Sequence, residues 1–293
     1  MPVWFGIVVA GLASVIMNFG LALQKQGAMK VPKLGKEKGA LAGFFKSKVW
    51  VLGFSLLLLG FGLNIYSAKI APISLVQTSL GIGLAVLALF SVFYLKEKIT
   101  LIEWVALVGM IIGIVLLGLS SIEESTAKLP DGFKLLVITG GILLLTILAY
   151  LLGKRGRLGG FRTDSLLGIV SGLFIGLGAI YLRSMFLFVD NDQKLLGYGI
   201  CLPVLVIAYV LGLGVMQSGF QHGKALIVVA LEAVSNKVIA IFGGMFALAE
   251  YLPQNRTLAI MRVIAFVLLL SGSGVLSRFG GKEVAEKISS PQA

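Results

Sequence analysis

The residues best suited to chemistry lie inside one long hydrophobic segment, which runs from about residue 224 to residue 249. Residues 231–237 read Leu-Glu-Ala-Val-Ser-Asn-Lys, so a carboxylate, an amide and an ammonium interrupt the apolar stretch. If the segment spans a bilayer, a charge near its centre costs on the order of 3 kcal/mol and usually faces a cavity or a partner. Glu232, Asn236 and Lys237 are therefore the first candidates for substrate binding.

Helix geometry indicates which of these three side chains can act together. Glu232 and Asn236 are four positions apart and share one face of a helix, whereas Glu232 and Lys237 differ by about 140° in direction. Two roles stay open for the charges. Either Lys237, with Glu232 and Asn236, lines a cavity where the ammonium holds an anionic group or exchanges a coupling proton, or each charge finds a partner on another helix and locks the bundle.

Polar side chains are sparse in the other hydrophobic segments. Asn64 and Gln77 are the next candidates for substrate contact, with hydrogen bonding between helices as the alternative for each. Glu103 and Trp104 open a further segment at its polar edge, where tryptophan is typical of a membrane interface. We expect Glu103 to remain solvated there.

The composition requires a lipid environment. Apolar residues make up 58% of the 293 residues and charged residues 13%, with a mean hydropathy of +1.00, which is outside the range of soluble domains. A bilayer core about 30 Å thick needs about 20 apolar residues per helix. Nine such runs lie near residues 3–24, 49–69, 71–95, 101–121, 133–152, 165–188, 195–217, 224–249 and 257–277. The sequence predicts an all-α integral membrane protein with about nine transmembrane helices, the first of which is retained.

The net charge of +12 is spread between these runs, which argues against nucleic acid as a partner. Basic residues follow the first, third and fifth runs, as seven lysines from 25 to 48, Lys96 and Lys98, and the stretch 154–162. The alternate connections carry Glu123, Glu124, Asp131, Asp190 and Asp192. The positive-inside rule then predicts a multi-pass protein of the plasma or inner membrane, with its N-terminus outside and its C-terminus in the cytoplasm. A homo-oligomer is compatible with this pattern.

Two segments share one layout. Ala71–Glu97 ends in Phe-Tyr-Leu-Lys-Glu and Lys224–Glu250 in Phe-Ala-Leu-Ala-Glu, and each is followed by a polar hinge and a glycine-bearing run. The copies are five spans apart and therefore run in opposite directions, an arrangement typical of transporters. We expect a first half at residues 1–124 with four spans, a second half at 125–280 with five, and a cytoplasmic tail at 281–293.

Glycines at helical spacing predict close helix packing. Gly109 and Gly113 form one pair, and Gly168, Gly172 and Gly176 form a ladder along one helix face. The single cysteine, Cys201, lies inside a run and is expected to be a small buried apolar residue.

Three motifs together resemble the drug/metabolite transporter superfamily: Asn18–Gly27 (NFGLALQKQG), Ala71–Gln77 (APISLVQ) and Leu95–Thr100 (LKEKIT). Their order and the nine spans are most similar to the NIPA-type magnesium transporter branch. The resemblance implies a ten-helix ancestral plan of two inverted halves around a substrate path, here with one helix fewer in the first half. Residues 231–237 depart from that branch, in which this helix is largely uncharged and carries a proline.

The sequence thus predicts a secondary transporter of a small solute without a cofactor. Magnesium or another divalent cation is one substrate, although Lys237 repels such an ion unless it is neutral or neutralised. An exporter or exchanger of a small metabolite or drug-like compound, with Lys237 in the substrate or proton site, is the alternative, and a non-transporting membrane scaffold is a further one. Motifs for ATP binding and for hydrolytic catalysis are absent from the sequence, so we expect no enzymatic activity.

Overall fold

The structure is a computed structural model of the chain, and it describes residues 3–32, 40–70, 81–120, 129–154, 163–248 and 255–279. The regular elements in these ranges are all helices, which confirms the predicted all-α class. They are α1 (Val3–Ala28), α2 (Ala40–Lys46), α3 (Lys48–Ile70), α5 (Gly81–Phe93), α6 (Leu101–Leu119), α7 (Gly132–Lys154), α8 (Thr163–Asp190), α9 (Lys194–Leu196), the π-helical η1 (Gly197–Cys201), α10 (Leu202–His222), α11 (Ala225–Ala247) and α12 (Arg256–Phe279).

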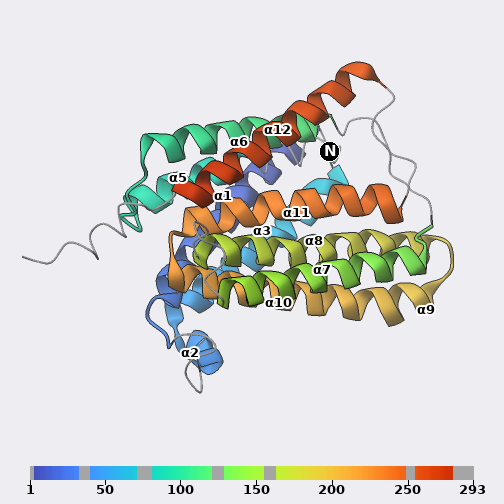
Figure 1. Cartoon of the computed structure of the whole chain (residues 1–293), viewed down its shortest axis with the longest axis horizontal. Helices are drawn as coiled ribbons and strands as arrows, with labels where there is room; N and C mark the ends of the chain where they lie inside the picture. Colours follow the sequence, from blue (N-terminus) through green and yellow to red (C-terminus); the bar gives the residue numbers. More distant parts are fainter. Residues whose placement is uncertain are drawn as a thin grey trace, which may run out of the picture.

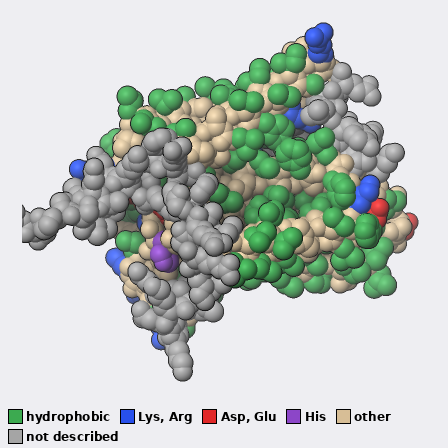
Figure 2. All heavy atoms as spheres, viewed as in Figure 1, with side chains coloured by type: hydrophobic (Ala, Val, Ile, Leu, Met, Phe, Trp, Pro, Cys, Tyr) green, Lys and Arg blue, Asp and Glu red, His purple; other side chains and the backbone are tan. Residues whose placement is uncertain are grey.

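Eight stretches of the described chain are helical, long and apolar enough to cross a bilayer, with α9, η1 and α10 forming one of them. The third predicted span, 71–95, falls partly outside the described residues, and its later part is the shorter apolar helix α5. The tail 281–293 also lies outside the described residues. Figure 2 shows hydrophobic side chains covering the long helices on the visible face, as expected of a surface solvated by lipid.

Successive long helices run in opposite directions (Figure 1). The ends of α1, α5, α7, α10 and α12 lie at one end of the bundle with the starts of α3, α6, α8 and α11. We call this the basic end, because Lys25, Lys98 and Lys224 lie there. The start of α1 and the ends of α3, α6, α8 and α11 lie at the opposite end.

The helix contacts follow the predicted repeat. α1 packs along α3 and α5, α8 packs along α10 and α11, and α6 packs along α12. The first set is α1, α3 and α5, and the second is α8, α10 and α11 in the same order. Each helix of the second set runs opposite to the corresponding helix of the first, so the two sets are related as inverted copies (Figure 1). The additional helix of the second half is α7, which packs on α8.

Glycines set the closest approaches between helices. A Cβ atom added to Gly53 of α3 would lie 2.5 Å from the carbonyl oxygen of Gly20 of α1, and one added to Gly172 of α8 would lie 2.4 Å from that of Glu232. Gly168 and Gly176 pack on α11 in the same way, so the predicted ladder is confirmed. Gly109 has open space at its Cβ position and does not serve this purpose.

We expect Gly53→Ala to lower the thermal unfolding temperature in detergent, because the added methyl group forces α1 and α3 apart. Overpacking of this kind costs about 1–3 kcal/mol. The matched control is Gly62→Ala on the same helix, where a Cβ atom meets nothing within 4 Å. Alanine favours a helix more than glycine does, so the control should be neutral or slightly stabilising. Equal unfolding temperatures for the two variants would contradict the close packing.

Candidate functional site

The helix α11 changes environment along its length. Its first seven residues, 225–231, are all buried, with no more than 4% of any side chain exposed, whereas most residues from Glu232 onward are half-buried. α11 starts at the basic end, so its continuous buried stretch lies there, and it is buried again at Gly243, Gly244 and Ala247 near its other end. α12 crosses α11 (Figure 1) and contacts its later half, where the rings of Phe242 and Phe266 lie 5.9 Å apart.

Glu232 and Asn236 lie on the same face of α11, as their spacing predicts. The side-chain amide of Asn236 donates a hydrogen bond to Oε1 of Glu232 over 3.4 Å, which is long for such a bond. Lys237 attracts Glu232 electrostatically, but in the described residues no ion pair joins the two. The phenol of Tyr209 on α10 also lies in the field of Glu232.

The backbone of α11 is fixed at this polar pair by α8. The Cβ position of Gly172 lies 3.0 Å from the backbone nitrogen of Asn236, and that of Gly176 lies 2.9 Å from its carbonyl oxygen. Because α8 presents only glycine backbone here, α11 can approach closely and cannot rotate freely. The two glycines therefore hold Glu232 and Asn236 in a defined position within the bundle.

Of the other two predicted site residues, Asn64 alone lies within the described part of the chain. Asn64 is half-buried on α3, which packs on α1 and α2 and makes no extensive contact with α11 in the described chain. Gln77 lies outside the described residues, so its role stays a prediction.

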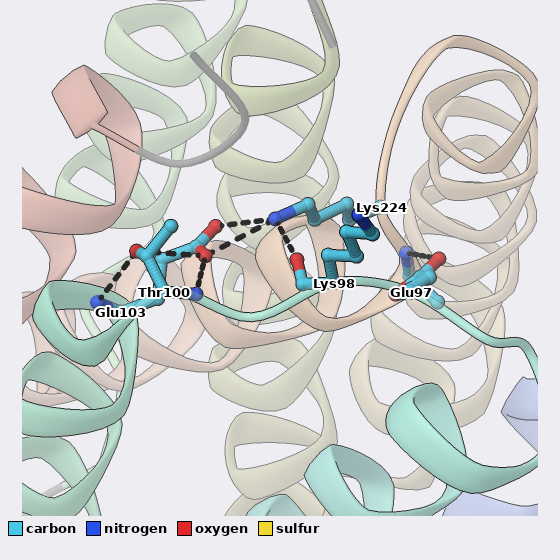
Figure 3. Close-up of polar contacts among 6 residues, drawn as sticks. Glu97, Lys98, Thr100, Glu103 and Lys224 are labelled. Carbon is cyan, nitrogen blue, oxygen red and sulfur yellow. Dashed lines mark hydrogen bonds and ion pairs between the residues drawn. The ribbon is translucent and has the colours of Figure 1, made fainter. Parts of the chain in front are cut away.

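A second polar cluster, which sequence reasoning missed, joins the two halves at the basic end (Figure 3). The ammonium of Lys224 lies 2.8 Å and 3.1 Å from the two carboxylate oxygens of Glu103, and it also donates to the carbonyl of Lys98. Only 1% of Glu103 is exposed. The expectation that Glu103 remains solvated is therefore wrong, because Lys224 of the second half covers it.

Glu103 is also held by its own helix. It forms a capping box with Thr100 at the start of α6: Thr100 N–H donates to Oε2 of Glu103 over 2.6 Å, and Glu103 N–H donates to the Thr100 hydroxyl over 3.4 Å. The Thr-x-x-Glu spacing in the sequence is a signal for this box. It carries no information about the lysine that completes the site.

Glu97 binds the start of α11 from the connection between α5 and α6. Its Oε1 accepts a hydrogen bond of 3.0 Å from the backbone N–H of Ala225, where the helix dipole favours a negative charge (Figure 3). Burial raises the pKa of Glu97 above its ordinary value, although this hydrogen bond and the ammonium groups of Lys25 and Lys224 oppose the shift. Its Oε2 is buried and has no hydrogen-bond partner among the described atoms.

The helix α1 joins the same end through Lys25, whose ammonium donates to the carbonyl of Phe220 on α10. Beside it lies a row of buried amides. The indole of Trp50 donates to Gln217 over 2.9 Å, and Gln217 donates to Gln24 over 2.6 Å. These bonds connect α3, α10 and α1, so the basic end is held by polar contacts from both halves.

A cleft of about 500 Å³ opens beside Glu97. It is lined by Val92, Lys96, Glu97, Lys98, Ile99, Thr100 and Trp104. Within the described ranges no three acidic, histidine or cysteine side chains come together as a group that could hold a metal ion.

A family model described as magnesium transporter NIPA matches residues 2–156. The probable magnesium transporter NIPA9 of Arabidopsis thaliana is 30% identical over 278 residues, which cover 92% of this chain and 80% of the relative. The chain belongs to the NIPA magnesium transporter family. No solved structure matches this NIPA-family chain.

Membership of the NIPA family confirms the resemblance seen in the sequence and makes the protein a multi-pass membrane transporter. A non-enzymatic role follows from the same family. The matched range 2–156 contains Lys25, Glu97 and Glu103 of the basic end. Glu232 and Lys237 lie beyond the range that the family model matches. They lie in the later part of the NIPA-family chain, which the alignment with the Arabidopsis relative includes.

In this NIPA-family protein, Glu97→Gln is expected to flatten the dependence of stability on pH. Because burial raises the pKa of Glu97 in the folded protein, the folded state binds this proton more tightly than the unfolded state does. The free energy of unfolding of the wild type therefore rises as the pH falls from the raised pKa toward the ordinary value of about 4.3. Above this window Glu97 is ionised, and the whole cost of burying its charge lowers the stability of the folded state. Thermal unfolding in detergent across this window should show a weaker pH dependence in Glu97→Gln. An unchanged dependence would contradict the burial of this carboxylate.

Proposed function

We propose that this NIPA-family transporter carries Mg²⁺ across the plasma or inner membrane by way of Glu232 and Asn236. The observation that carries the proposal is the change in burial along α11 at Glu232, which leaves a carboxylate half-buried inside the bundle beyond a sealed end. The name of the relative, a probable magnesium transporter, supports the choice of ion. Oxygen atoms of the carboxylate and the amide are ligands that Mg²⁺ prefers.

Lys237 determines how such a site can accept a divalent cation. With the carboxylate ionised and the ammonium protonated, the empty site is neutral overall. Mg²⁺ dehydrates reluctantly, so we propose that it binds with most of its water shell and contacts Glu232 directly or through water. Its charge repels the ammonium strongly in a low dielectric. Lys237 then releases its proton to water on the side from which Mg²⁺ binds. It regains a proton on the other side after Mg²⁺ leaves, so that Mg²⁺ moves in exchange for a proton.

The alternative substrate is an anionic metabolite held by the ammonium of Lys237. It is favoured by the lack of an ion pair on this lysine among the described residues. In this case Lys237 binds the substrate directly and Glu232 repels it. The two substrate classes therefore predict opposite roles for the two charges.

The orientation that we propose places the basic end in the cytoplasm, with the N-terminus outside and the C-terminus inside. The excess of lysine and arginine in the connections at that end supports it. The path would run between the first half, residues 1–124, and the second half, residues 125–280. Protease accessibility of terminal tags in sealed membrane vesicles tests the orientation.

The deciding experiment reconstitutes the purified protein alone in sealed vesicles that contain a Mg²⁺-sensitive dye. We expect Mg²⁺ entry that depends on the protein and is accompanied by proton movement in the opposite direction, compared with vesicles without protein. Restored growth of cells deficient in magnesium transport would be the matching result in vivo. Anion flux without Mg²⁺ flux would favour the metabolite carrier, and absence of flux for all solutes tested would favour a scaffold.

A further inference from the structure

The contacts at the basic end converge on the start of a single helix. Lys224 is the N-cap residue of α11 and Ala225 is its first residue. Lys224 is bound by Glu103 and by the carbonyl of Lys98, and the N–H of Ala225 is bound by Glu97 (Figure 3). The three acceptors belong to the α5–α6 connection and the start of α6. The first half thus holds the start of α11 by two carboxylates and a carbonyl.

The buried part of α11 lies directly behind these contacts. Residues 225–231 separate Lys224 from Glu232 and pack against α8, α10 and core residues of the first half. While the start of α11 is held in place, these seven residues seal Glu232 from the basic end. If the contacts of Lys224 and Ala225 are released, the start of α11 can move away from α6 and expose the seal.

Near the opposite end, the described contacts between the halves are of a different kind. The guanidinium of Arg262 on α12 donates to the carbonyl of Ser120 over 2.8 Å, which joins α12 to the end of α6. This contact does not involve α11, and from Glu232 onward most of α11 is only half-buried. The described conformation is therefore closed at the basic end by contacts between the halves, whereas near the opposite end α11 packs on other neighbours, with the rings of Phe242 and Phe266 5.9 Å apart and Ala247 4% exposed.

We infer that Glu97, Glu103 and Lys224 form the closed gate of the transport cycle at the basic end, where they act as positioning residues through α11. The inference rests on the proposed path past Glu232. The side chains do not touch the substrate; instead they set whether the site is accessible from the basic end. Breaking the Lys224–Glu103 pair leaves a buried charge unpaired in the closed arrangement. The free energy of the closed arrangement therefore rises relative to that of the open one.

The test measures access to the seal and requires no substrate. Cys201 is replaced by alanine, and a cysteine is introduced by Ala230→Cys at a site that is 0% exposed. A membrane-impermeant maleimide is applied to sealed vesicles from the side of the basic end or from the opposite side. We expect Lys224→Met and Glu103→Gln each to raise the labelling rate from the basic end about tenfold or more, which corresponds to a shift of the open population by that factor.

Two further variants separate a gate from a general loss of structure. Lys224→Arg keeps the positive charge and should label as slowly as the wild type. Asp131→Asn removes a carboxylate that accepts a hydrogen bond from Phe133 at the start of α7, at the opposite end, and should leave labelling from the basic end unchanged. A structural role alone would raise labelling from both sides and lower the unfolding temperature in proportion.

Unchanged labelling in folded Lys224→Met and Glu103→Gln would overturn the gate. If those variants do not fold, Glu97→Ala takes their place, because it removes the acceptor that binds the N–H of Ala225 at the start of α11. Faster labelling from the basic end is again expected, and wild-type labelling would count against the gate. Because labelling is measured without Mg²⁺, the two proposals can fail separately. Absence of Mg²⁺ flux would contradict the proposed function, whereas faster labelling in the variants would still support the gate.

Discussion

Glu232→Gln should reduce Mg²⁺ flux into reconstituted vesicles by on the order of a hundredfold, equal to about 2.7 kcal/mol of lost stabilisation. The substitution preserves the size of the side chain and its ability to hydrogen-bond Asn236, and it removes the negative charge. Without that charge, nothing at residue 232 offsets the repulsion between Mg²⁺ and the ammonium of Lys237, so the site binds Mg²⁺ more weakly. The initial rate of dye response at saturating external Mg²⁺ is the measurement.

The matched control for Glu232→Gln is Asp190→Asn, which removes an exposed carboxylate at the end of α8. Its flux should equal that of the wild type, because no described contact links Asp190 to the path. Glu232→Asp, which keeps the charge on a shorter side chain, should retain measurable flux. Wild-type flux in folded Glu232→Gln would exclude this carboxylate as the Mg²⁺ ligand.

The limits of the helices show what hydropathy can and cannot predict. The run near 195–217 predicts a helix that ends too early, since α10 continues to His222. The missing turn contains Gln221, and Gln217 marks the predicted end. Both side chains are polar yet satisfied within the bundle, Gln217 by Trp50 and Gln24, and Gln221 by the carbonyl of Ala28. Hydropathy measures the cost of transferring a side chain into lipid. It therefore predicts the end of a helix at polar residues, even where the helix continues and those residues hydrogen-bond to other parts of the protein.

The two polar clusters differ in how far local spacing could predict them. Glu232 and Asn236 are four residues apart on one helix, and helix geometry alone places them together. Glu103 and Lys224 lie in different halves, so their contact depends on how those halves pack. In the sequence Lys224 is one of many lysines on the basic side, and the positive-inside rule already accounts for it. The contacts of the glycines also depend on how the helices pack. A Cβ atom on Gly113 would contact Leu269 of α12, whereas one on Gly109, in the same spaced pair, would contact nothing.

The two clusters are connected through α11. Glu103 and Glu97 bind its start at Lys224 and Ala225, the seal occupies its first two turns at 225–231, and Glu232, Asn236 and Lys237 follow. A helix moves as a rigid element over this length, so displacement of its start also shifts the polar residues against α8. Binding of an ion at Glu232 and opening at the basic end are then coupled without any contact between the two sites.

Lys237→Met is expected to separate proton coupling from ion movement. The substitution keeps an unbranched side chain of similar length and removes the group that we propose releases a proton when Mg²⁺ binds. Uptake of Mg²⁺ driven by a pH gradient should fall about tenfold or more, equal to about 1.4 kcal/mol. Exchange of external for internal Mg²⁺ should persist, because the loaded site contains Glu232 and no longer an opposing ammonium.

Isotopic exchange of Mg²⁺ and gradient-driven net uptake are measured in the same vesicles, so that each preparation serves as its own control. Lys134→Met gives the matched comparison: it removes an ammonium that lies 5.7 Å from the ring centre of Phe246, away from Glu232, and should preserve both activities. Loss of both exchange and net uptake in folded Lys237→Met would contradict a role of Lys237 in proton coupling alone, because exchange of Mg²⁺ for Mg²⁺ requires no proton release. The anionic metabolite alternative makes a different prediction for the wild type, which would then carry anions and show no Mg²⁺ exchange at all.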